Sequence, residues 1–408
     1  MSQEIPGMSP SQLMRDLGER LQAPIEYWDP LFLTGVPGVG KTEILRQITE
    51  AVGLPFWPCR PIQHESVEYT GLPFVRNPDM QAITGLLREI AEGMGVKLKA
   101  QVGDDGASAL SGLEIQPQAK GCWVPFEELL PTMKDWEGVI FMDEFTQLDV
   151  SLQKVGASLL DKEGVAGRRI PRGARFVLAG NRQEDRAGAN RLISIIESRC
   201  RQTMLLFSLR DWQQWAITAN IDHIVRSFSD FKGNEFVPPF DPAKKLNPLP
   251  RTWVKVSNEL RAHPNASTDK DDSILGPAVR GWVGMGHGSE FMAYREHFHM
   301  LHNVVDKVFN TPDKVDVDSD PSVQYALIGA ISARFGEKSD RLSNDQIGNI
   351  VKFARRVYPK SMQALLCVHC RVAERNQKDK KFLKAPEALK WCTEHADTLA
   401  AWRKGWDT

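Results

Sequence analysis

The chain has 408 residues, a length that corresponds to roughly two or three domains of ordinary size. Apolar residues make up 42% and charged residues 25%, the balance of a globular protein with a sizeable core. The chain has 51 basic and 52 acidic residues, which gives a net charge of −1. This balance argues against a chain dominated by binding to nucleic acid or to an anionic membrane. The sequence has no apolar run near the roughly 18 residues of a membrane span, and residues 1–22 lack the apolar segment of a signal peptide. We therefore expect a cytoplasmic protein without membrane association.

The first half of the chain alternates between helical and strand patterns. Residues 8–22 predict a helix, because leucines repeat every four residues after a Ser-Pro start. Short apolar runs predict buried strands at residues 31–34, 54–57, 139–142 and 176–179. Helical patterns lie between them, for example at residues 42–52 and 148–160. This alternation is typical of βαβ units, so we expect an α/β fold with a parallel sheet.

The spacing of these strands indicates an insertion. About 80 residues separate the second run from the third, whereas a crossover between parallel strands needs only about a dozen. We place the insertion at about residues 61–121. Its part from 99 to 121 is rich in Gly, Ala, Ser, Gln and Asp, which predicts a mobile loop.

The second half of the chain predicts only helices. After about residue 240 no buried-strand run is present, and helical patterns occupy residues 251–262, 278–308, 321–335, 344–356 and 361–376. Pro-rich residues 237–250 and acidic residues 311–320 are typical of linkers. We therefore expect an α/β module at 1–235, a small helical domain at 236–300 and a helical C-terminal region at 301–408.

A phosphate-binding motif follows the first apolar run. The octapeptide GVPGVGKT fits the pattern G-x-x-x-x-G-K-S/T. Glycines let backbone N–H groups surround phosphate oxygens, Lys41 reaches the β- and γ-phosphates, and the Thr42 hydroxyl binds Mg²⁺. The helix that begins here directs its positive end at the anion. The residues expected to bind the nucleotide are Gly35, Val36, Pro37, Gly38, Val39, Gly40, Lys41 and Thr42.

Polar residues follow two later apolar runs. Asp143 and Glu144 come directly after VIFM, and Asn181 comes after FVLAG. In an open parallel sheet, ligands bind at the carboxyl ends of the strands, where these side chains are expected. Asp143 is predicted to hold Mg²⁺ through water, and Glu144 to orient and polarise the attacking water. Asn181 is suited to hold that water or the γ-phosphate.

Taken together, these motifs resemble those of the AAA+ ATPases. Over about residues 30–260, the successive motifs are similar in sequence to those of the MoxR-like branch. These motifs are GVPGVGKT, GVIFMDEF, GRRIPRGARFVLAGNRQEDR, ESRC and LPRTW. The resemblance implies that Asn181 is the sensor 1 residue and that Arg251 is the sensor 2 residue of a helical lid. It places the arginine finger at Arg199. This chain has Arg-Cys where the family usually has Arg-Phe, which leaves Arg201 as the alternative finger.

The resemblance also implies a function. A MoxR-like protein is a Mg²⁺-dependent ATP hydrolase that assembles as a homo-oligomeric ring, expected here to be hexameric. The ring is required because the finger neutralises charge on a neighbour's γ-phosphate. The expected work is remodelling or chaperone-like activation of a protein client, with a von Willebrand type A domain protein as the candidate client.

Three other functions stay open from the sequence. A nucleic-acid-stimulated motor ATPase would use the arginines of the segment before sensor 1, although the neutral chain favours a solvated hairpin there. A P-loop small-molecule kinase would need no arginine from a neighbour. A nucleotide-gated scaffold would not need Glu144. The arginines in question are Arg168, Arg169, Arg172 and Arg175.

A CxxC and a CxxH lie near the C-terminus. Their spacing is compatible with a zinc site formed by Cys367, Cys370, Cys392 and His395. However, the first pair lies inside an apolar helical pattern and the second pair follows a proline that begins another helix. Because free cysteine is commonly a small core residue, we favour core packing over zinc.

Overall fold

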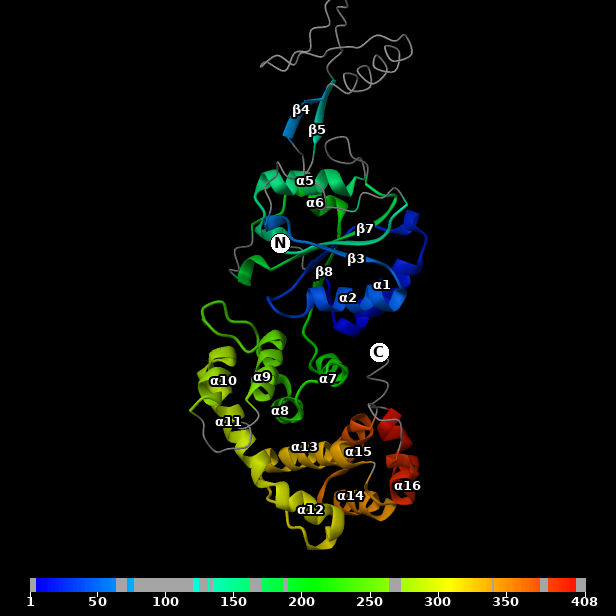
Figure 1. Ribbon diagram of the computed structural model, residues 1–408, viewed down its shortest axis with the longest axis vertical. Helices are drawn as coiled ribbons and strands as arrows, with labels where there is room; N and C mark the ends of the chain where they lie inside the picture. Colours follow the sequence, from blue (N-terminus) through cyan, green and yellow to red (C-terminus); the bar gives the residue numbers. More distant parts are fainter. Residues whose placement is uncertain are drawn as a thin grey trace, which may run out of the picture.

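The computed structural model describes residues 5–63, 72–76, 120–124, 131, 135–161, 170–185, 190–263, 273–339, 341–374 and 381–400. These residues form an α/β module followed by an all-helical region (Figure 1). The expected fold class, a parallel sheet with helices followed by helices alone, is confirmed.

A six-stranded parallel sheet forms the centre of the α/β module. Its strand order is β1-β8-β2-β7-β6-β3. The four expected strands are all present, and two further strands, β1 and β8, extend the sheet on the other side of β2. The strands are β1 (Gly7–Met8), β2 (Leu31–Thr34), β3 (Phe56–Cys59), β6 (Glu137–Met142), β7 (Gly173–Gly180) and β8 (Arg201–Leu205).

Helices cover both faces of the sheet, which explains the uninterrupted apolar runs within β2, β6 and β7. In β2, Leu31 and Leu33 pack toward α1 (Pro10–Gln22) and α2 (Lys41–Val52). The intervening Phe32 packs toward α5 (Val150–Leu160) and α6 (Ser194–Arg199) on the opposite face. Figure 1 shows these two helical layers on either side of the sheet. A strand buried on both faces reads as a continuous apolar run, and this pattern led to the correct prediction.

The first helix forms for reasons that are visible in its sequence. Ser9 caps α1 in a capping box with Gln12, and Pro10 occupies the first turn. Leu13, Leu17 and Leu21 are buried, as their spacing predicts.

The insertion begins and ends in a two-stranded antiparallel ladder. Strand β4 (Leu72–Arg76) pairs with β5 (Lys120–Val124), with Leu72 opposite Val124 and Arg76 opposite Lys120. The ladder extends from the α/β module on the side of α5 (Figure 1). Of the expected mobile loop at 99–121, residues 99–119 lie outside the described residues, whereas Lys120 and Gly121 belong to strand β5.

The helical region shares one hydrophobic core, which runs from Trp212 to Leu399. Helix α13 is central, since it packs against α8, α11, α12 and α15. Residues 209–232, expected in the α/β module, form α7 and α8 and contribute to this core. The helices are α7 (Leu209–Thr218), α8 (His223–Lys232), α9 (Pro250–Ala262), α10 (Leu275–Val283), α11 (Met285–Met300), α12 (His302–Asn310), α13 (Pro321–Lys338), α14 (Asn344–Val357), α15 (Lys360–Ala373) and α16 (Pro386–Glu394).

One helical prediction was too long. The pattern at 278–308 is divided among α10, α11 and α12. The first break is at Gly284, whose φ of 84° is not helical, and the second is at Leu301. Short 3₁₀ turns join several elements: Ile25–Tyr27, Pro61–Gln63, Phe145–Gln147, Gln183–Asp185, Gly233–Phe236, Pro312–Lys314 and Phe382–Lys384.

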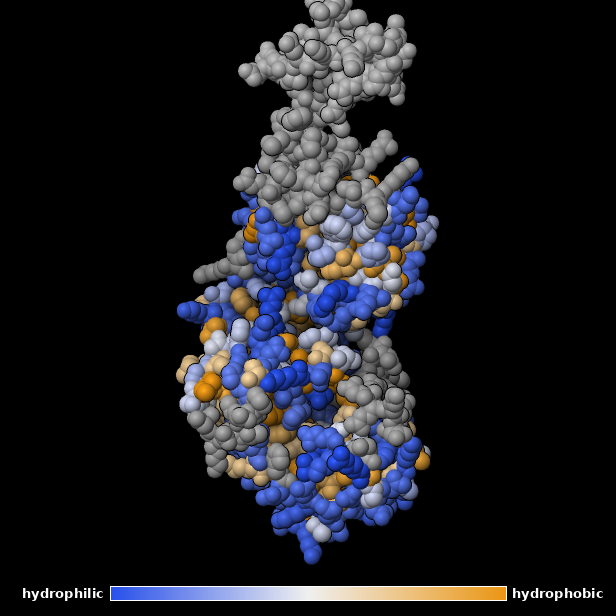
Figure 2. All heavy atoms as spheres, viewed as in Figure 1, coloured by the Kyte–Doolittle hydropathy of each residue, from blue (hydrophilic) through white to orange (hydrophobic). Residues whose placement is uncertain are grey.

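The surface is mixed in character. Figure 2 shows a mostly hydrophilic face on which apolar side chains form small, separate patches. Among the described helices, none has the length and the apolar composition needed to cross a membrane.

Candidate functional site

The loop between β2 and α2 has the geometry of an anion site. Gly38 and Gly40 adopt φ values of 74° and 111°, which favour glycine. The first backbone hydrogen bond of α2 runs from Ile44 N to Gly40 O at 2.9 Å. The N–H groups of residues 41–43 therefore have no acceptor within the helix, and they carry the positive end of its dipole. This is the arrangement that binds phosphate at helix N-termini.

Lys41 is buried at this helix start, with 8% of its surface exposed. Its Nζ donates to the carbonyl oxygens of Gly35 at 2.9 Å and Val36 at 3.4 Å, and to Oδ1 of Asn181 at 3.1 Å. Burial lowers the pKa of Lys41 to about 8. Asp143 opposes this shift, whereas the positive charge of Arg251 adds to it. A bound polyphosphate would place negative charge beside this ammonium group and so favour its charged form.

The two halves of the expected magnesium site are in contact. Thr42 Oγ1 donates to Oδ2 of Asp143 at 2.9 Å. The other carboxylate oxygen, Oδ1, accepts the N–H of Glu144 at 2.9 Å. A hydroxyl and a carboxylate side by side, next to a phosphate-binding loop, are oxygen ligands of the kind that Mg²⁺ takes. The donor set therefore fits this ion.

Glu144 has an unusual backbone. Its φ of 57° and ψ of 27° lie in the left-handed region, which few residues other than glycine adopt. Asp143 Oδ1 holds its N–H, and its carbonyl accepts from Gln147 N at 2.9 Å. Within the described residues its carboxylate makes no hydrogen bond or ion pair. Strained, non-glycine backbone of this kind is often found at functional sites.

Asn181 lies at the end of β7, and its neighbours bring it to the loop. Its N–H donates to Thr146 Oγ1 at 3.1 Å, while its Oδ1 accepts from Lys41. A Cβ atom at the preceding residue, Gly180, would lie 2.4 Å from Thr146 Cγ2, so only glycine allows this close approach.

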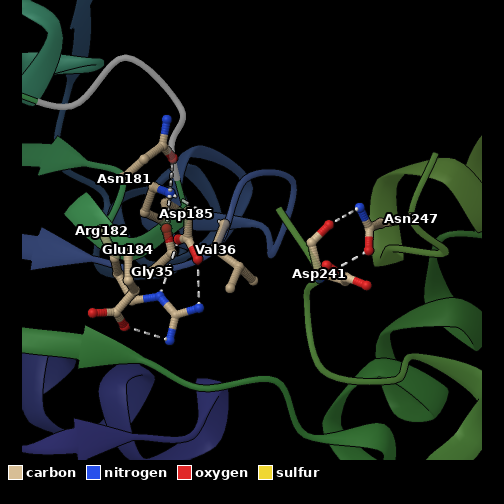
Figure 3. A network of polar contacts seen from close by, with 9 residues as sticks. Gly35, Val36, Asn181, Arg182, Glu184, Asp185, Asp241 and Asn247 are labelled. Carbon is tan, nitrogen blue, oxygen red and sulfur yellow. Dashed lines mark hydrogen bonds and ion pairs between the residues drawn. The ribbon is translucent and has the colours of Figure 1, made fainter. Parts of the chain in front are cut away.

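A charged group beside Lys41 was not identified from the sequence. Arg182 forms ion pairs with Asp185 at 2.6 Å and Glu184 at 3.1 Å, and the charges of Arg182 and Asp185 both influence the pKa of Lys41. Figure 3 shows this cluster beside Gly35 and Val36. The signal was the charged run that directly follows Asn181.

Arg251 joins the helical region to the loop. It is the second residue of α9, and a Cβ at Gly38 would lie 3.3 Å from Arg251 Cβ and 3.8 Å from its Nε. Leu249 approaches the same glycine. In the described part of the chain, no hydrogen bond or ion pair engages the Arg251 guanidinium. In the turn that precedes α9, Asp241 and Asn247 are hydrogen-bonded to each other (Figure 3).

The two candidate finger arginines have different partners. Arg199 ends α6 and binds α5, through Nη1 to Ala157 O at 3.0 Å and through Nη2 to Asp161 Oδ2 at 2.6 Å. Arg201 begins β8 and pairs with Asp16 of α1. Within the described chain, neither arginine makes a hydrogen bond or ion pair with residues 35–42.

The arginines considered for nucleic acid are not a uniform surface group. Arg175 is 2% exposed, pairs with Glu137 at 2.9 Å and donates to the carbonyl oxygens of Gly173 and Ala23. The expectation that Arg175 is a solvated hairpin residue was therefore wrong, because the residue lies within β7. Arg168 and Arg169 lie outside the described residues.

The cysteines expected in the core are placed in helices. Cys367 and Cys370 are buried in α15, and burial raises the pKa of both thiols. Cys392 is half-buried in α16. Over the described ranges, no group of three or more His, Cys, Asp or Glu side chains is arranged to hold a metal ion.

Comparisons with known proteins complete this description. No family model matches the chain, and no curated protein matches it. Two mutant forms of RuvB from Thermotoga maritima are similar to 81% and 82% of it, covering 81% and 83% of their own chains, at 14% and 13% identity and TM-scores of 0.33 and 0.32. NtrX from Brucella abortus is similar to 84% of it and covers 67% of its own chain, at 13% identity and a TM-score of 0.32. Such distant likenesses assign no family and no activity, so the functional argument rests on the site.

Proposed function

We propose that the chain is a Mg²⁺-dependent ATPase of the AAA+ class, of the MoxR-like type. The observation that carries this proposal is the convergence at one sheet edge of side chains from three separate segments. Lys41 and Thr42 come from α2, Asp143 follows β6 and Asn181 follows β7, and direct hydrogen bonds join them. A buried lysine on a glycine loop, paired with a hydroxyl and a carboxylate, suits a nucleotide polyphosphate and its metal.

Each residue has a role in the proposed reaction. The N–H groups at the start of α2 and the Lys41 ammonium bind the phosphates and stabilise charge as the γ-phosphoryl group transfers. Thr42 and Asp143 would hold Mg²⁺, which neutralises phosphate oxygens when bound. Glu144, whose carboxylate has no hydrogen bond or ion pair within the described part of the chain, orients water and polarises it toward the γ-phosphate. Asn181 fixes the direction of that attack.

The assembly we propose is a homo-oligomeric ring of six subunits. Among the described residues, Arg199 pairs with α5 and makes no hydrogen bond or ion pair with the loop at 35–42, which supports a role at a neighbour's site. Both arginines pair with an aspartate of their own chain, but the side chain of Arg199 is the more exposed, at 37% against 27% for Arg201, so we propose Arg199 as the finger. Arg251 approaches Gly38 from α9, since a Cβ at Gly38 would lie 3.3 Å from Arg251 Cβ, so a nucleotide at the loop would shift the helical region through α9.

The work we propose is remodelling of a protein client. This part rests on the likeness of the motifs to those of MoxR-like proteins, for which a von Willebrand type A domain protein is the candidate client. The β4–β5 ladder extends from the module at the insertion, where such proteins engage partners. The burial of Arg175 removes one arginine from the set that would support a nucleic-acid motor.

Phosphate release from ATP tests the proposal directly. The purified chain should hydrolyse ATP with Mg²⁺ and stop when the metal is chelated. Glu144→Gln should abolish turnover, whereas Glu50→Gln, the same change at an exposed position of α2, should leave it intact. Turnover that rises only with DNA or RNA would favour a motor, and transfer to a small molecule in place of water would favour a kinase. Electron microscopy with a non-hydrolysable ATP analogue counts the subunits.

A further inference from the structure

Two buried polar side chains lie behind the candidate site, on the segment that follows Glu144. Thr146 is 4% exposed and Gln153 is 0% exposed. Neither is a proposed ligand of the nucleotide or of the metal. Buried polar groups must be hydrogen-bonded, so their partners show what these two residues hold in place.

Thr146 holds the segments on both sides of the 186–189 stretch. Its Oγ1 accepts the N–H of Asn181 at 3.1 Å, and its carbonyl oxygen accepts the N–H of Asn190 at 2.5 Å. Gly180 makes room for its methyl group. Thr146 is two residues from Glu144, so one turn carries the proposed base and also fixes the backbone of the proposed sensor.

Gln153 holds the start of α6. Its Nε2 donates to Leu148 O at 3.1 Å and Arg191 O at 3.3 Å, and its Oε1 accepts from Ile193 N at 2.9 Å. Ile193 is the N-cap residue of α6. The side-chain amide therefore uses both donors and its acceptor on backbone groups, two of which belong to the segment that leads into α6.

The other end of α6 is bound to the same helix. Arg199 contacts Ala157 and Asp161 at the end of α5, and Ile196 packs into the core between them. With six residues, α6 is too short to be stable by itself, so its position depends on these anchors. Gln153 is the buried side-chain anchor at the end opposite Arg199.

We propose that Thr146 and Gln153 are positioning residues that serve two different active sites. Thr146 orients Asn181 for the site of its own subunit. Gln153 sets α6 so that Arg199 is presented to the site of the neighbouring subunit. The inference rests on the proposed ATPase ring. It predicts that a variant of Thr146 impairs the site of its own subunit, whereas a variant of Gln153 impairs the site of the neighbouring subunit, although both residues lie on one short segment.

Single variants give the first test. Thr146→Val keeps the shape but removes the hydroxyl, and Gln153→Met keeps the length but removes the amide. Each should lower kcat by about tenfold or more while KM for ATP stays within about threefold, because the phosphate contacts are untouched. Thr146→Ser should restore kcat, since it restores the acceptor. The control is Ser158→Ala, an exposed hydroxyl on α5, which should behave like the parent.

Mixing inactive subunits gives the decisive test. Gln153→Met mixed with Glu144→Gln should recover activity, because the first subunit contributes an intact site and the second an intact Arg199. Gln153→Met mixed with Arg199→Ala should show no gain over the two separate variants. Thr146→Val should show the reverse pattern, with recovery only beside Arg199→Ala. As a control, the double mutant of Glu144→Gln and Arg199→Ala is mixed with the parent protein. The ATPase activity of this mixture shows how strongly inactive subunits lower the activity of their neighbours.

The outcomes separate this inference from the proposed function. If Glu144→Gln mixed with Arg199→Ala stays inactive although the subunits exchange, the ring arrangement fails and this inference fails with it. If that pair recovers but Gln153→Met recovers beside Arg199→Ala, Gln153 serves its own site and the inference is overturned. Ile193→Pro removes the N–H that Gln153 accepts at a compatible φ of −72° and should repeat the Gln153→Met pattern. If both Gln153→Met and Ile193→Pro lose cooperative melting, Gln153 is a structural residue only.

Discussion

The hydroxyl of Thr42 donates a hydrogen bond of 2.9 Å to Asp143, a residue 101 positions later in the chain. The two residues follow strands that are not adjacent, because β7 lies between β2 and β6. The contact therefore depends on the parallel alignment of all three strands. It also ties the start of α2 to the turn that carries Glu144, so the proposed metal ligands and the proposed base form one connected unit.

ATP affinity should depend on pH through Lys41. Its pKa is lowered to about 8 in the free protein, and a bound polyphosphate would favour the ammonium form and raise it. Binding then takes up a proton above pH 8. Affinity should therefore fall as pH rises above about 8, approaching tenfold per pH unit. Calorimetry over about two pH units around the Lys41 pKa, from roughly pH 7.5 to 9.5, measures this change in affinity.

Lys41→Arg is the matched control for this pH dependence, because arginine keeps its charge throughout that range. Its affinity should be weaker but independent of pH. Lys41→Ala should weaken ATP binding by about tenfold or more, which corresponds to about 1.4 kcal/mol. Unchanged affinity in Lys41→Ala would contradict the phosphate-loop assignment.

Glu144→Gln should separate binding from hydrolysis. The amide keeps the size of the side chain and removes the carboxylate that polarises water. Hydrolysis should fall by about 10²-fold or more while ATP still binds. Steady-state phosphate release together with ATP calorimetry checks both halves of this prediction. A parental rate in the variant would show that Glu144 is not the base.

Arg251→Ala should alter both turnover and the titration of Lys41. Its positive charge lowers the pKa of Lys41, so removal of that charge should raise this pKa and move the loss of ATP affinity to higher pH. Turnover should fall by about tenfold, because the arginine also lies over Gly38 at the loop. Lys255→Ala, an exposed cation on the same helix, is the control and should leave the pH profile in place.

Arg199→Ala should bind ATP and hydrolyse it poorly. A finger arginine contributes about 10³–10⁵ in rate in other phosphoryl-transfer proteins. Mixed with Glu144→Gln, it should recover activity at up to about a quarter of the interfaces if subunits mix at random and act independently. Phosphate release after demonstrated subunit exchange is the measurement, and a mixture that stays inactive would exclude a role in trans.

Arg201→Ala should lower stability more than turnover. Burial raises the pKa of Asp16, but the hydrogen bonds and charges of Arg201 and Arg20 outweigh burial and hold this pKa below its usual value. Such a pair stabilises the fold above the unfolded pKa of about 4, and the contribution is lost as pH falls through the folded pKa. The variant should lose about 1 kcal/mol at neutral pH, and its deficit should close in acid. Thermal melts of the parent and the variant over about four pH units, from roughly pH 7 down to 3, measure how this difference in stability changes.

Arg20→Ala is the comparison for this prediction, since Arg20 pairs with the same carboxylate from a more exposed position. Its effect on the melting temperature should be smaller. A large loss of hydrolysis in Arg201→Ala with an unchanged melt would instead make Arg201 the finger.

Local patterns in the sequence determined the elements that depend on neighbouring residues. The loop at 35–42 could be predicted because glycine, lysine and threonine at fixed spacing have a direct chemical meaning. Strands β2, β6 and β7 could be predicted because burial on both faces produces an uninterrupted apolar run. In contrast, β8 has the sequence Arg-Gln-Thr-Met-Leu, and this mixture of polar and apolar residues does not predict a strand inside the sheet.

Only the tertiary structure decided which charged side chains act together. Arg175 is buried against Glu137, Arg201 is paired with Asp16, and Arg199 is held on α5, although the sequence alone does not give the partner of any of these arginines. The approach of Arg251 to Gly38 likewise joins segments that are far apart in the chain. An arginine carries the same charge wherever it occurs, so its role depends on the partner that the fold places within reach.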